Sequence, residues 1–287
     1  MTDEPLLDVE NLWVKFHTRT GIVDAVRGIS FTLGRERLGI VGESGSGKSM
    51  TGRAILRLIR PPGQIEADKM EMHGEDILHA PEDRMRRLRG GRVSMIMQDP
   101  KFSLNPVMTV GQQMVEALRA HEKVSKSEAR ERAIAMLDEV AIRDPERVYG
   151  LYPHEVSGGM GQRIMIAMMV LPNPEILIAD EPTSALDVSV QLQVLEIMNK
   201  LVRDRGMGLI FISHDLNLVA KFCDRIVIMY AGRIVETCNA SELKNASHPY
   251  TVGLLNSVPD LENPRERLDV LQRDPTWTDA PSVSARV

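Results

Sequence analysis

The chain alternates between short apolar runs and longer segments in which apolar residues recur every three or four positions. The short runs predict buried strands, and the longer segments predict amphipathic helices. Near the N-terminus, residues 6–16 and 25–33 alternate partly between apolar and polar positions, and the turn residues Thr18 to Gly21 lie between them. This pattern predicts an antiparallel hairpin.

The rest of the chain repeats a strand followed by a helix. Apolar runs predict strands at 38–41, 93–97, 176–179, 209–212 and 226–229, and helical spacing predicts helices at 49–59, 109–137, 157–171, 188–205 and 216–222. Strands that alternate with helices are typical of a parallel α/β sheet. The mostly helical residues 103–168 predict an inserted lobe. The polar, proline-bearing sequence beyond Pro259 predicts a loose tail, at least from residue 274 to residue 287.

Charge and composition argue against a nucleic-acid partner. The net charge is -5 and the pI is about 5.9. The most basic run, residues 84–89, directly follows Glu82 and Asp83. We interpret this run as a solvated helix face, with a phosphate or RNA site as the less favoured alternative.

Cysteine usage and hydropathy bear on the compartment. Cys223 and Cys238 lie fifteen positions apart, without a CxxC pair, so neither a disulfide framework nor a zinc site is expected and a reducing compartment is favoured. The N-terminus lacks the basic and then apolar pattern of a signal peptide. No apolar stretch approaches the roughly eighteen residues of a membrane span. Any work at a membrane is therefore expected to depend on docking to a partner.

A complete phosphate-binding motif, G-x-x-x-x-G-K-[ST], follows the apolar run at 38–41. Its residues are Gly42, Glu43, Ser44, Gly45, Ser46, Gly47, Lys48 and Ser49, and the predicted helix continues through Met50. Glycines let backbone N–H groups point at a phosphate chain, the helix N-terminus favours negative charge, the lysine supplies a cation and the serine hydroxyl suits Mg²⁺. The motif predicts a nucleotide site without separating an ATPase from a kinase or GTPase.

Polar residues close three of the predicted strands. Asp180 and Glu181 end the strand at 176–179, and successive strand side chains face opposite ways, so we expect one carboxylate to face a metal and the other an attacking water. The alternative is a solvated acidic turn. His214 and Gln98 follow two other strands, and strand carboxyl ends in a parallel sheet face the ligand crevice. Gln98 is expected to reach Mg²⁺ or the water, and a purely structural role is the alternative for His214.

A second anion-binding helix start is predicted at Ser157, Gly158 and Gly159. A serine N-cap, two glycines and a following helix give this segment N–H groups that suit a phosphate. Two such helix starts so far apart along the chain indicate a site shared between two subunits.

Residues 156–163 resemble the signature motif of ABC ATPases, and the resemblance covers residues 5–260. It implies a P-loop NTPase (RecA-like) α/β core, an N-terminal antiparallel β subdomain, an inserted α-helical subdomain at about 103–168 and a flexible extension at 261–287. It also implies roles for single residues. Phe16 stacks on adenine, Gln98 forms the Q-loop, Asp180 holds Mg²⁺, Glu181 is the catalytic base, residues 184–187 with Asp187 form the D-loop, and His214 is the switch histidine.

Further details resemble one branch, the dipeptide and oligopeptide importer ATPases, which also serve nickel, glutathione, opine and some saccharide importers. They are the phosphate loop itself, Gln98-Asp99-Pro100 with residues 103–106, and His248-Pro249-Tyr250-Thr251 with residues 253–255. The branch implies ATP hydrolysis coupled to uptake, with ATP and Mg²⁺ as cofactors. It implies a second ATPase subunit, identical or paralogous, two transmembrane permeases and, indirectly, a periplasmic solute-binding protein. The place implied is the cytoplasmic face of a bacterial inner membrane, and the solute stays open.

Three departures from the branch matter. Gly161 replaces a usual Arg in the signature, Phe16 is smaller than the common Tyr or Trp, and a cysteine-rich C-terminal segment is lacking, so no iron–sulfur cluster is expected.

Four rival functions are disfavoured. Coiled-coil repair ATPases need heptads, translation factors need two cassettes, exporters lack the His248-Pro249-Tyr250 segment, and a non-hydrolytic binding module would lack Glu181 or His214. The lobe at 103–168 is expected to dock on the permeases near Phe102 and Leu104.

Overall fold

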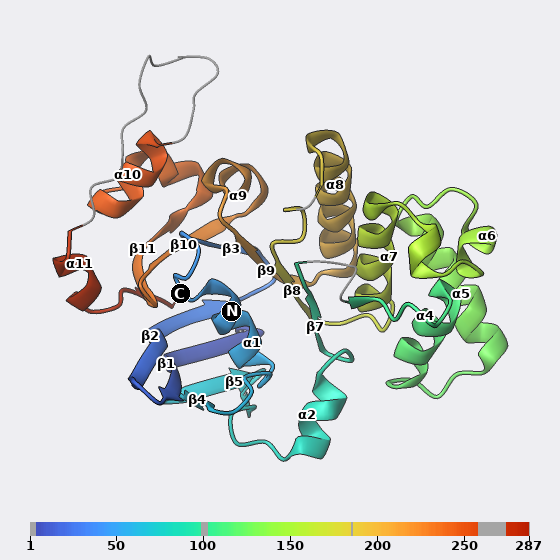
Figure 1. Ribbon diagram of the computed structural model, residues 1–287, viewed down its shortest axis with the longest axis horizontal. Coiled ribbons are helices and arrows are strands. Elements are labelled where there is room, and N and C mark those ends of the chain that lie inside the picture. The colour runs from blue at the N-terminus through green and yellow to red at the C-terminus, as the bar shows by residue number, and fades with distance from the viewer. Residues whose placement is uncertain (1–3, 99–102, 185, 258–273, 287) are drawn as a thin grey trace. The chain divides into compact units, whose positions relative to one another are not determined.

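The computed structural model describes residues 4–98, 103–184, 186–257 and 274–286. The chain folds into two compact units. The first contains residues 1–79 and 210–287, and the second contains residues 80–209 (Figure 1). None of the described helices combines the length and the apolar composition that crossing a bilayer needs.

An antiparallel sheet dominates the N-terminal part of the first unit. Strands β1 (Leu7–Thr18) and β2 (Gly21–Leu33) form the predicted hairpin. β1 also pairs with β4 (Gly63–Glu66) and β5 (Lys69–Met72), and β5 pairs with β6 (Glu75–Asp76). Alternate side chains such as Leu12 and Val14 are fully buried, as the partial alternation predicts.

A parallel pair of strands carries the phosphate loop of the same unit. β3 (Arg37–Val41) pairs in parallel with β10 (Arg225–Tyr230), and β10 pairs antiparallel with β11 (Arg233–Asn239). β9 (Gly208–Ser213) lies on the other side of β3. Helix α1 (Lys48–Ile55) follows β3 in the chain. Helix α9 (Leu216–Phe222) packs on β3. At Gly39 a Cβ would lie 2.2 Å from Val219 Cγ1, so this glycine permits the close approach of α9.

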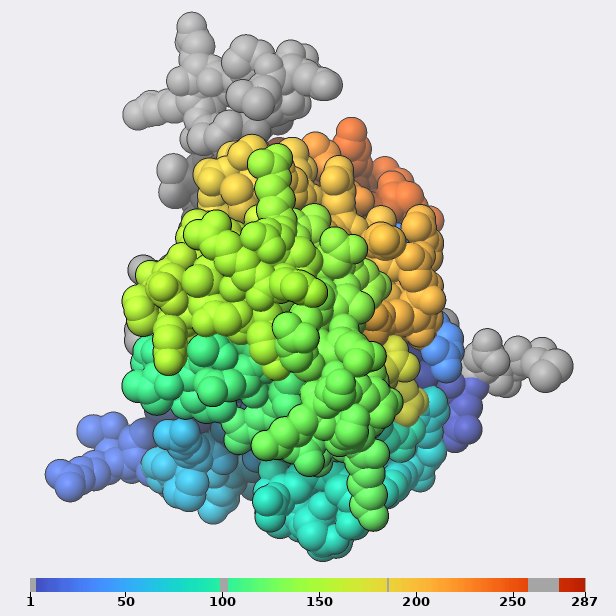
Figure 2. Space-filling model, turned by 90° about the vertical axis from the view of Figure 1, so that its right-hand side faces the viewer, coloured from blue at the N-terminus to red at the C-terminus, as the bar shows by residue number. Residues whose placement is uncertain are grey.

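The second unit combines a buried parallel strand pair with a group of helices. β7 (Val93–Ile96) and β8 (Ile176–Asp180) pair in parallel, and every residue of both strands is buried. The helices are α2 (Glu82–Leu88), α4 (Val110–Arg119), α5 (Lys126–Glu139), α6 (Pro145–Tyr149), α7 (Gly158–Val170) and α8 (Val188–Arg205). α7 contacts β7, α4, α5 and α8. Figure 2 shows the helical part from outside, with α5 and α6 in green and yellow-green towards the viewer.

The architecture confirms the predicted α/β class, and two helices differ from their predicted bounds. The helix expected at 49–59 ends at Ile55, because Arg57 has a positive φ of 51° and leaves the helical region. The helix expected at 109–137 is two helices. Thr109 caps α4 with a capping box, and the Ser125 hydroxyl accepts the Glu128 N–H and starts α5.

Residues 274–286 differ from the expectation of a loose tail. They form α11 (Thr276–Asp279) and β12 (Ser284–Ala285), and β12 pairs in parallel with β2. The Arg225 guanidinium donates 2.6 Å hydrogen bonds to the carbonyls of Ala285 and Thr32, and Arg286 forms ion pairs with Asp8 and Glu10. This tail is therefore held by buried polar contacts, which its polar composition did not reveal. The rest of the expected extension, residues 261–273 and 287, lies outside the described residues.

Candidate functional site

The phosphate loop connects β3 to α1 within the first unit. Gly45 and Gly47 have φ values of 82° and 99°, which side chains other than glycine rarely adopt. The Lys48 side chain turns back over the loop and is only 5% exposed. Its ammonium donates to the carbonyl oxygens of Gly42 at 2.7 Å and Glu43 at 2.8 Å. A buried cation is thus held at the centre of the loop.

Neighbouring backbone restricts the residues that this loop accepts. A Cβ at Gly42 would lie 2.1 Å from the Met229 carbonyl oxygen, and a Cβ at Gly47 would lie 2.5 Å from the Ala25 carbonyl oxygen. The Gly232 N–H also donates to the Ser46 carbonyl at 3.0 Å. No side-chain cap holds the N-terminus of α1, where Gly47 is the N-cap. Its N–H groups therefore suit an anionic ligand, and so does the lysine beside them.

Two other predicted residues lie in the first unit. Phe16 is half-buried on β1, opposite Val23 of β2 and Gly63 of β4. A Cβ at Gly63 would lie 2.7 Å from the Phe16 ring, so glycine makes room for that ring. His214 is exposed in the turn between β9 and α9. The next residue, Asp215, caps α9 by accepting the Leu218 N–H.

The second unit brings Gln98 and Glu181 together. Gln98 follows β7, Glu181 follows β8, and the Gln98 amide Nε2 donates to Glu181 Oε2 at 3.2 Å. Asp180 is only 4% exposed, whereas Glu181 is half-buried. Glu181 also has a positive φ of 47°, which is uncommon outside glycine. Adjacent carboxylates thus occupy different environments, and such backbone strain is often found at functional sites.

The start of α7 at Ser157 and the start of α8 at Asp187 lie side by side in this unit. The Ser157 hydroxyl accepts the Met160 N–H at 3.3 Å, so it caps α7. A Cβ at Gly159 would lie 2.7 Å from Val190 Cγ1, whereas a Cβ at Gly158 would meet nothing within 4 Å. Gly159 therefore lets α7 approach the first turn of α8, and Gly158 leaves open space at the helix start.

Asp187 is the N-cap of α8. Its carboxylate accepts from the Ser189 hydroxyl at 2.7 Å and from the Val190 N–H at 3.0 Å. These hydrogen bonds lower the pKa of the Asp187 carboxyl below its ordinary value. The structure thus gives Asp187 a capping role in addition to the predicted place in the D-loop.

Comparison with known proteins identifies the family. A family model described as ABC transporter matches residues 26–184, more than half of the 287 residues. The chain is 49% identical to the oligopeptide transport ATP-binding protein OppD of Bacillus subtilis (strain 168), over 91% of this chain and 74% of that protein. The chain belongs to the ABC transporter family. It is also 47% identical to a putative peptide import ATP-binding protein of Brucella abortus (strain 2308), over 93% of this chain and 81% of that protein.

Solved structures of ABC cassettes share the fold. A dimeric bacterial ABC transporter cassette aligns with a TM-score of 0.73 and 26% identity, over 82% of this chain and 98% of that one. A second structure, described as a post-hydrolysis dimer bound to ADP and Pi, aligns with a TM-score of 0.71 and 25% identity, over the same shares of the two chains.

The structure describes the signature helix around Gly161, but only part of the predicted Q-loop region and D-loop. Gly161 is buried in the first turn of α7 and its N–H donates to the Ser157 carbonyl at 2.8 Å, so the signature helix forms across this unusual glycine. Asp99, Pro100 and Phe102 of the predicted Q-loop region and Ala185 of the D-loop lie outside the described residues.

The sequence of this ABC protein did not predict one contact of the phosphate loop. The Glu43 N–H of the phosphate loop donates to the Tyr250 hydroxyl at 3.1 Å, across 207 positions of the chain. The segment at 248–251 stood out as a mark of the importer branch, but nothing in its spacing indicates which residue it contacts.

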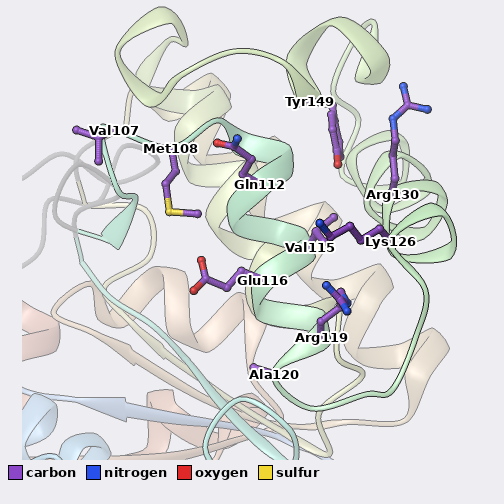
Figure 3. A pocket seen from close by; sticks show the side chains of 10 residues that line it. All are labelled: Val107, Met108, Gln112, Val115, Glu116, Arg119, Ala120, Lys126, Arg130 and Tyr149. Carbon is purple, nitrogen blue, oxygen red and sulfur yellow. The ribbon is translucent and has the colours of Figure 1, made fainter.

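Residues of α4, α5 and α6, with the loop before α4, line a surface cavity of about 1080 Å³ (Figure 3). Figure 3 shows α4 between Met108 and Glu116 on one side and Tyr149 and Lys126 on the other. The cavity wall is apolar at Val107, Met108 and Val115 and cationic at Arg119, Lys126 and Arg130.

Side-chain packing and exposure define this cavity further. The Arg130 guanidinium lies 5.4 Å from the centre of the Tyr149 ring. Gly111 permits that ring to pack on α4, because a Cβ there would lie 2.3 Å from Tyr149 Cζ. Docking was expected near Leu104, but Leu104 is only 5% exposed and therefore cannot itself form the docking surface. Val107 is 78% exposed.

Proposed function

We propose that this chain is the ATP-binding and ATP-hydrolysing subunit of an ABC importer for peptides or related small solutes. The observation that carries the proposal is the Gln98–Glu181 hydrogen bond at the end of β8, beside the buried Asp180. A phosphate loop alone serves many reactions, whereas a carboxylate held at this position favours hydrolysis. Relatives named as peptide-import or oligopeptide-transport ATP-binding proteins are 44% to 49% identical and support the same assignment.

Nucleotide binding is assigned to the first unit. The residues from Gly42 to Met50 hold the phosphates, with backbone N–H groups, the start of α1 and the Lys48 ammonium as donors. The carbonyl oxygens that hold Lys48 keep its charge inside the loop. Phe16 is assigned to stack against the adenine base, for which its partly exposed ring is suited.

Magnesium is assigned to oxygen donors. The Ser49 hydroxyl, the Asp180 carboxylate and the Gln98 amide oxygen are all hard ligands of the kind that Mg²⁺ takes. The burial of Asp180 fits this role, because a buried carboxylate needs a cation or several hydrogen-bond donors around it. When bound, Mg²⁺ supplies charge neutralisation at the phosphate oxygens.

Hydrolysis is assigned to Glu181, with Gln98 and His214 as its helpers. The Glu181 carboxylate is the base that orients a water and accepts its proton. Gln98 donates to one oxygen of that carboxylate and so helps to orient it. His214 is assigned the role of the switch histidine, as the resemblance implies.

The proposed partners are a second ATPase subunit, two transmembrane permeases and, through them, a solute-binding protein. Ser157, Gly158 and Gly159 are assigned to the nucleotide held by the second ATPase subunit, and the open space beside Gly158 suits this contact. The cavity around α4 is assigned to a permease helix, because its apolar and cationic lining fits a helix with apolar and acidic side chains. These contacts would hold the subunit at the cytoplasmic face of a bacterial inner membrane.

Reconstitution with the permeases tests the proposal. The chain should be co-purified with the second ATPase subunit and with the permeases encoded by neighbouring genes. The complex should then be placed in liposomes together with the binding protein. We expect ATP hydrolysis that rises when the binding protein carries a peptide. Hydrolysis that rises with nickel, an opine or a saccharide but with no peptide would change the solute class. No hydrolysis in the assembled complex would contradict the function itself.

A further inference from the structure

The segment from His248 to Thr251 has no part in the chemistry assigned above, although it marks the importer branch. Tyr250 of this segment is fully buried in the first unit. Its hydroxyl oxygen accepts the Glu43 N–H at 3.1 Å. A residue near the C-terminal end of the cassette thus touches the backbone of the phosphate loop.

The backbone of Glu43 is held on both sides of its Cα. Its carbonyl oxygen accepts from the Lys48 ammonium, and its N–H donates to Tyr250. An N–H that points to a buried hydroxyl is turned away from the phosphates, so it marks where the phosphate-facing part of the loop begins. The Tyr250 bond uses neither Lys48 nor Ser49, and it can therefore persist when a nucleotide is bound.

Several rings fix the position of Tyr250. Its N–H donates to Nδ1 of His248, the N-cap of α10 (Pro249–Asn256). Its ring lies 4.6 Å from the ring of Tyr230 on β10 and 6.2 Å from that of Trp277 on α11. Trp277 also packs edge-on against Tyr230 at 6.0 Å and His248 at 5.8 Å. Figure 1 shows α10 and α11 beside β10 and β11.

A half-buried carboxylate holds the start of α10. Glu236 on β11 accepts the N–H groups of Ser247 and His248 at 2.7 Å and 3.3 Å. Burial opposes ionisation of Glu236, but the hydrogen bonds from Ser247 and His248 help to lower the pKa of this carboxyl below its ordinary value. The tyrosine is therefore supported by β10, β11 and the tail at 274–286.

We propose that Tyr250 is a positioning residue for nucleotide binding: its hydroxyl fixes the Glu43 peptide and so sets the phosphate loop, and Trp277 of the tail supports it. The inference rests on the proposed function, in that the loop at 42–49 binds nucleotide. It adds a link between the C-terminal tail and the phosphate loop. Loss of the link loosens the loop without removing any group that touches the phosphates.

The test compares Tyr250→Phe with the matched control Tyr230→Phe. Each variant loses one hydroxyl from the same ring cluster, and only Tyr250 bonds to Glu43. Backbone hydrogen exchange over residues 42–47 is measured first, without nucleotide. Affinity for Mg-ATP and Mg-ADP is then measured by titration calorimetry. We expect faster exchange at Glu43 and roughly three- to tenfold weaker nucleotide binding in Tyr250→Phe, and wild-type behaviour in Tyr230→Phe.

The outcomes separate the inference from the proposed function. A wild-type chain that binds no ATP would contradict the function, and the exchange measurement would still test the Tyr250 contact. If the wild type binds ATP and Tyr250→Phe matches it in both affinity and exchange, the inference is wrong. Equal loss in Tyr230→Phe would also overturn it, because the hydroxyl on Glu43 would not be the cause.

A third variant, Trp277→Phe, tests the support from the tail. It keeps a ring in place and leaves the Tyr250 hydroxyl intact. We expect exchange at Glu43 to rise, but less than in Tyr250→Phe. A lower melting temperature with wild-type exchange over residues 42–47 would show that Trp277 serves stability alone, and this part of the inference would fall.

Discussion

Glu181 and Lys48 show how single residues acquire chemistry from their surroundings. Glu181 leaves β8 with a positive φ and accepts the Gln98 amide, whereas its neighbour Asp180 stays buried as the last residue of the strand. Lys48 is buried against two loop carbonyls. In both cases hydrogen bonds hold a charged group in one place, and such preorganisation lowers the cost of organising a site.

Replacement of Lys48 should weaken nucleotide binding. In Lys48→Ala the outer phosphates lose a charge-assisted donor, and such bonds contribute about 1.5–3 kcal/mol, or roughly ten- to a hundredfold in affinity. Titration calorimetry with Mg-ATP measures the loss. Lys221→Ala removes an equal charge from the exposed face of α9 and should bind normally. Wild-type affinity in Lys48→Ala would refute the assignment of the loop.

Helix boundaries show which elements the sequence could predict. Strand–helix alternation predicted β7, β8, α7, α8 and α9 nearly as found, because each is a continuous apolar or periodic run. The end of α1 depends on one backbone angle at Arg57, which has no signature in residue type. The tail at 274–286 depends on contacts with β2 and β10, distant in sequence, so its polar composition was misleading.

The candidate site was predictable where it lies in contiguous motifs. The phosphate loop, the carboxylates at the end of β8 and the serine cap of α7 follow from local residue types and their order. The Tyr250–Glu43 bond joins residues 207 positions apart, and Gly159 matters because of Val190 on another helix. Such contacts depend on tertiary packing, and a single sequence gives no signal for them.

The packing of α7 against α8 should tolerate a methyl group at Gly158 but not at Gly159. Gly159→Ala would push a Cβ into Val190, and overpacking of this kind costs about 1–3 kcal/mol, whereas Gly158→Ala meets open space. Urea unfolding of both variants measures the difference. Val190→Ala in the Gly159→Ala background should restore part of the stability. Equal stability of the two alanine variants would contradict the packing described here.

The ion pair between β3 and the start of β10 should make stability depend on acid pH. Arg37 hydrogen bonds lower the pKa of the Asp224 carboxyl below its ordinary value of 3.8, against the opposing effect of burial. The ionised carboxylate therefore stabilises the fold above pH 3.8, and this contribution is lost as the pH falls through the lower folded pKa.

The variant Asp224→Asn tests this dependence. Because the pair is partly exposed, we expect the free energy of unfolding in urea to fall by only about 0.5–1 kcal/mol at pH 7. The decrease should become smaller as the pH falls below the pKa of the carboxyl in the unfolded chain. Asp138→Asn, at an exposed position of α5, should change little at either pH. A loss for Asp224→Asn that stays constant down to low pH would argue against the ion pair.

At the scale of the whole molecule, function depends on surfaces that the chain offers to other proteins. The cavity around α4 combines exposed Val107 with three cationic side chains, and it lies on the same unit as Gln98 and Glu181. A permease helix bound there would contact the unit that carries Glu181, the carboxylate proposed to act in hydrolysis. This arrangement offers a physical route by which hydrolysis and transport are coupled.

A charge placed in this cavity should uncouple the subunit from its permeases. Val107→Asp adds a carboxylate where an acidic permease helix is proposed to bind, so we expect normal ATP binding but loss of co-purification with the permeases, or hydrolysis without uptake. Ile22→Asp, at a 60% exposed apolar position of the β1–β2 hairpin, is the matched control. Normal assembly and uptake in Val107→Asp would place the docking surface elsewhere.

The central claim is that Glu181 carries ATP hydrolysis, and one measurement tests it most directly: ATP binding and single-turnover hydrolysis by Glu181→Gln in the assembled transporter. The amide keeps the shape of the side chain but cannot accept a proton from water, so we predict Mg-ATP binding within about twofold of wild type and hydrolysis slowed by roughly a hundredfold or more. Glu196→Gln, at an exposed position of α8, should hydrolyse ATP normally. Turnover by Glu181→Gln close to that of the wild type would contradict the account.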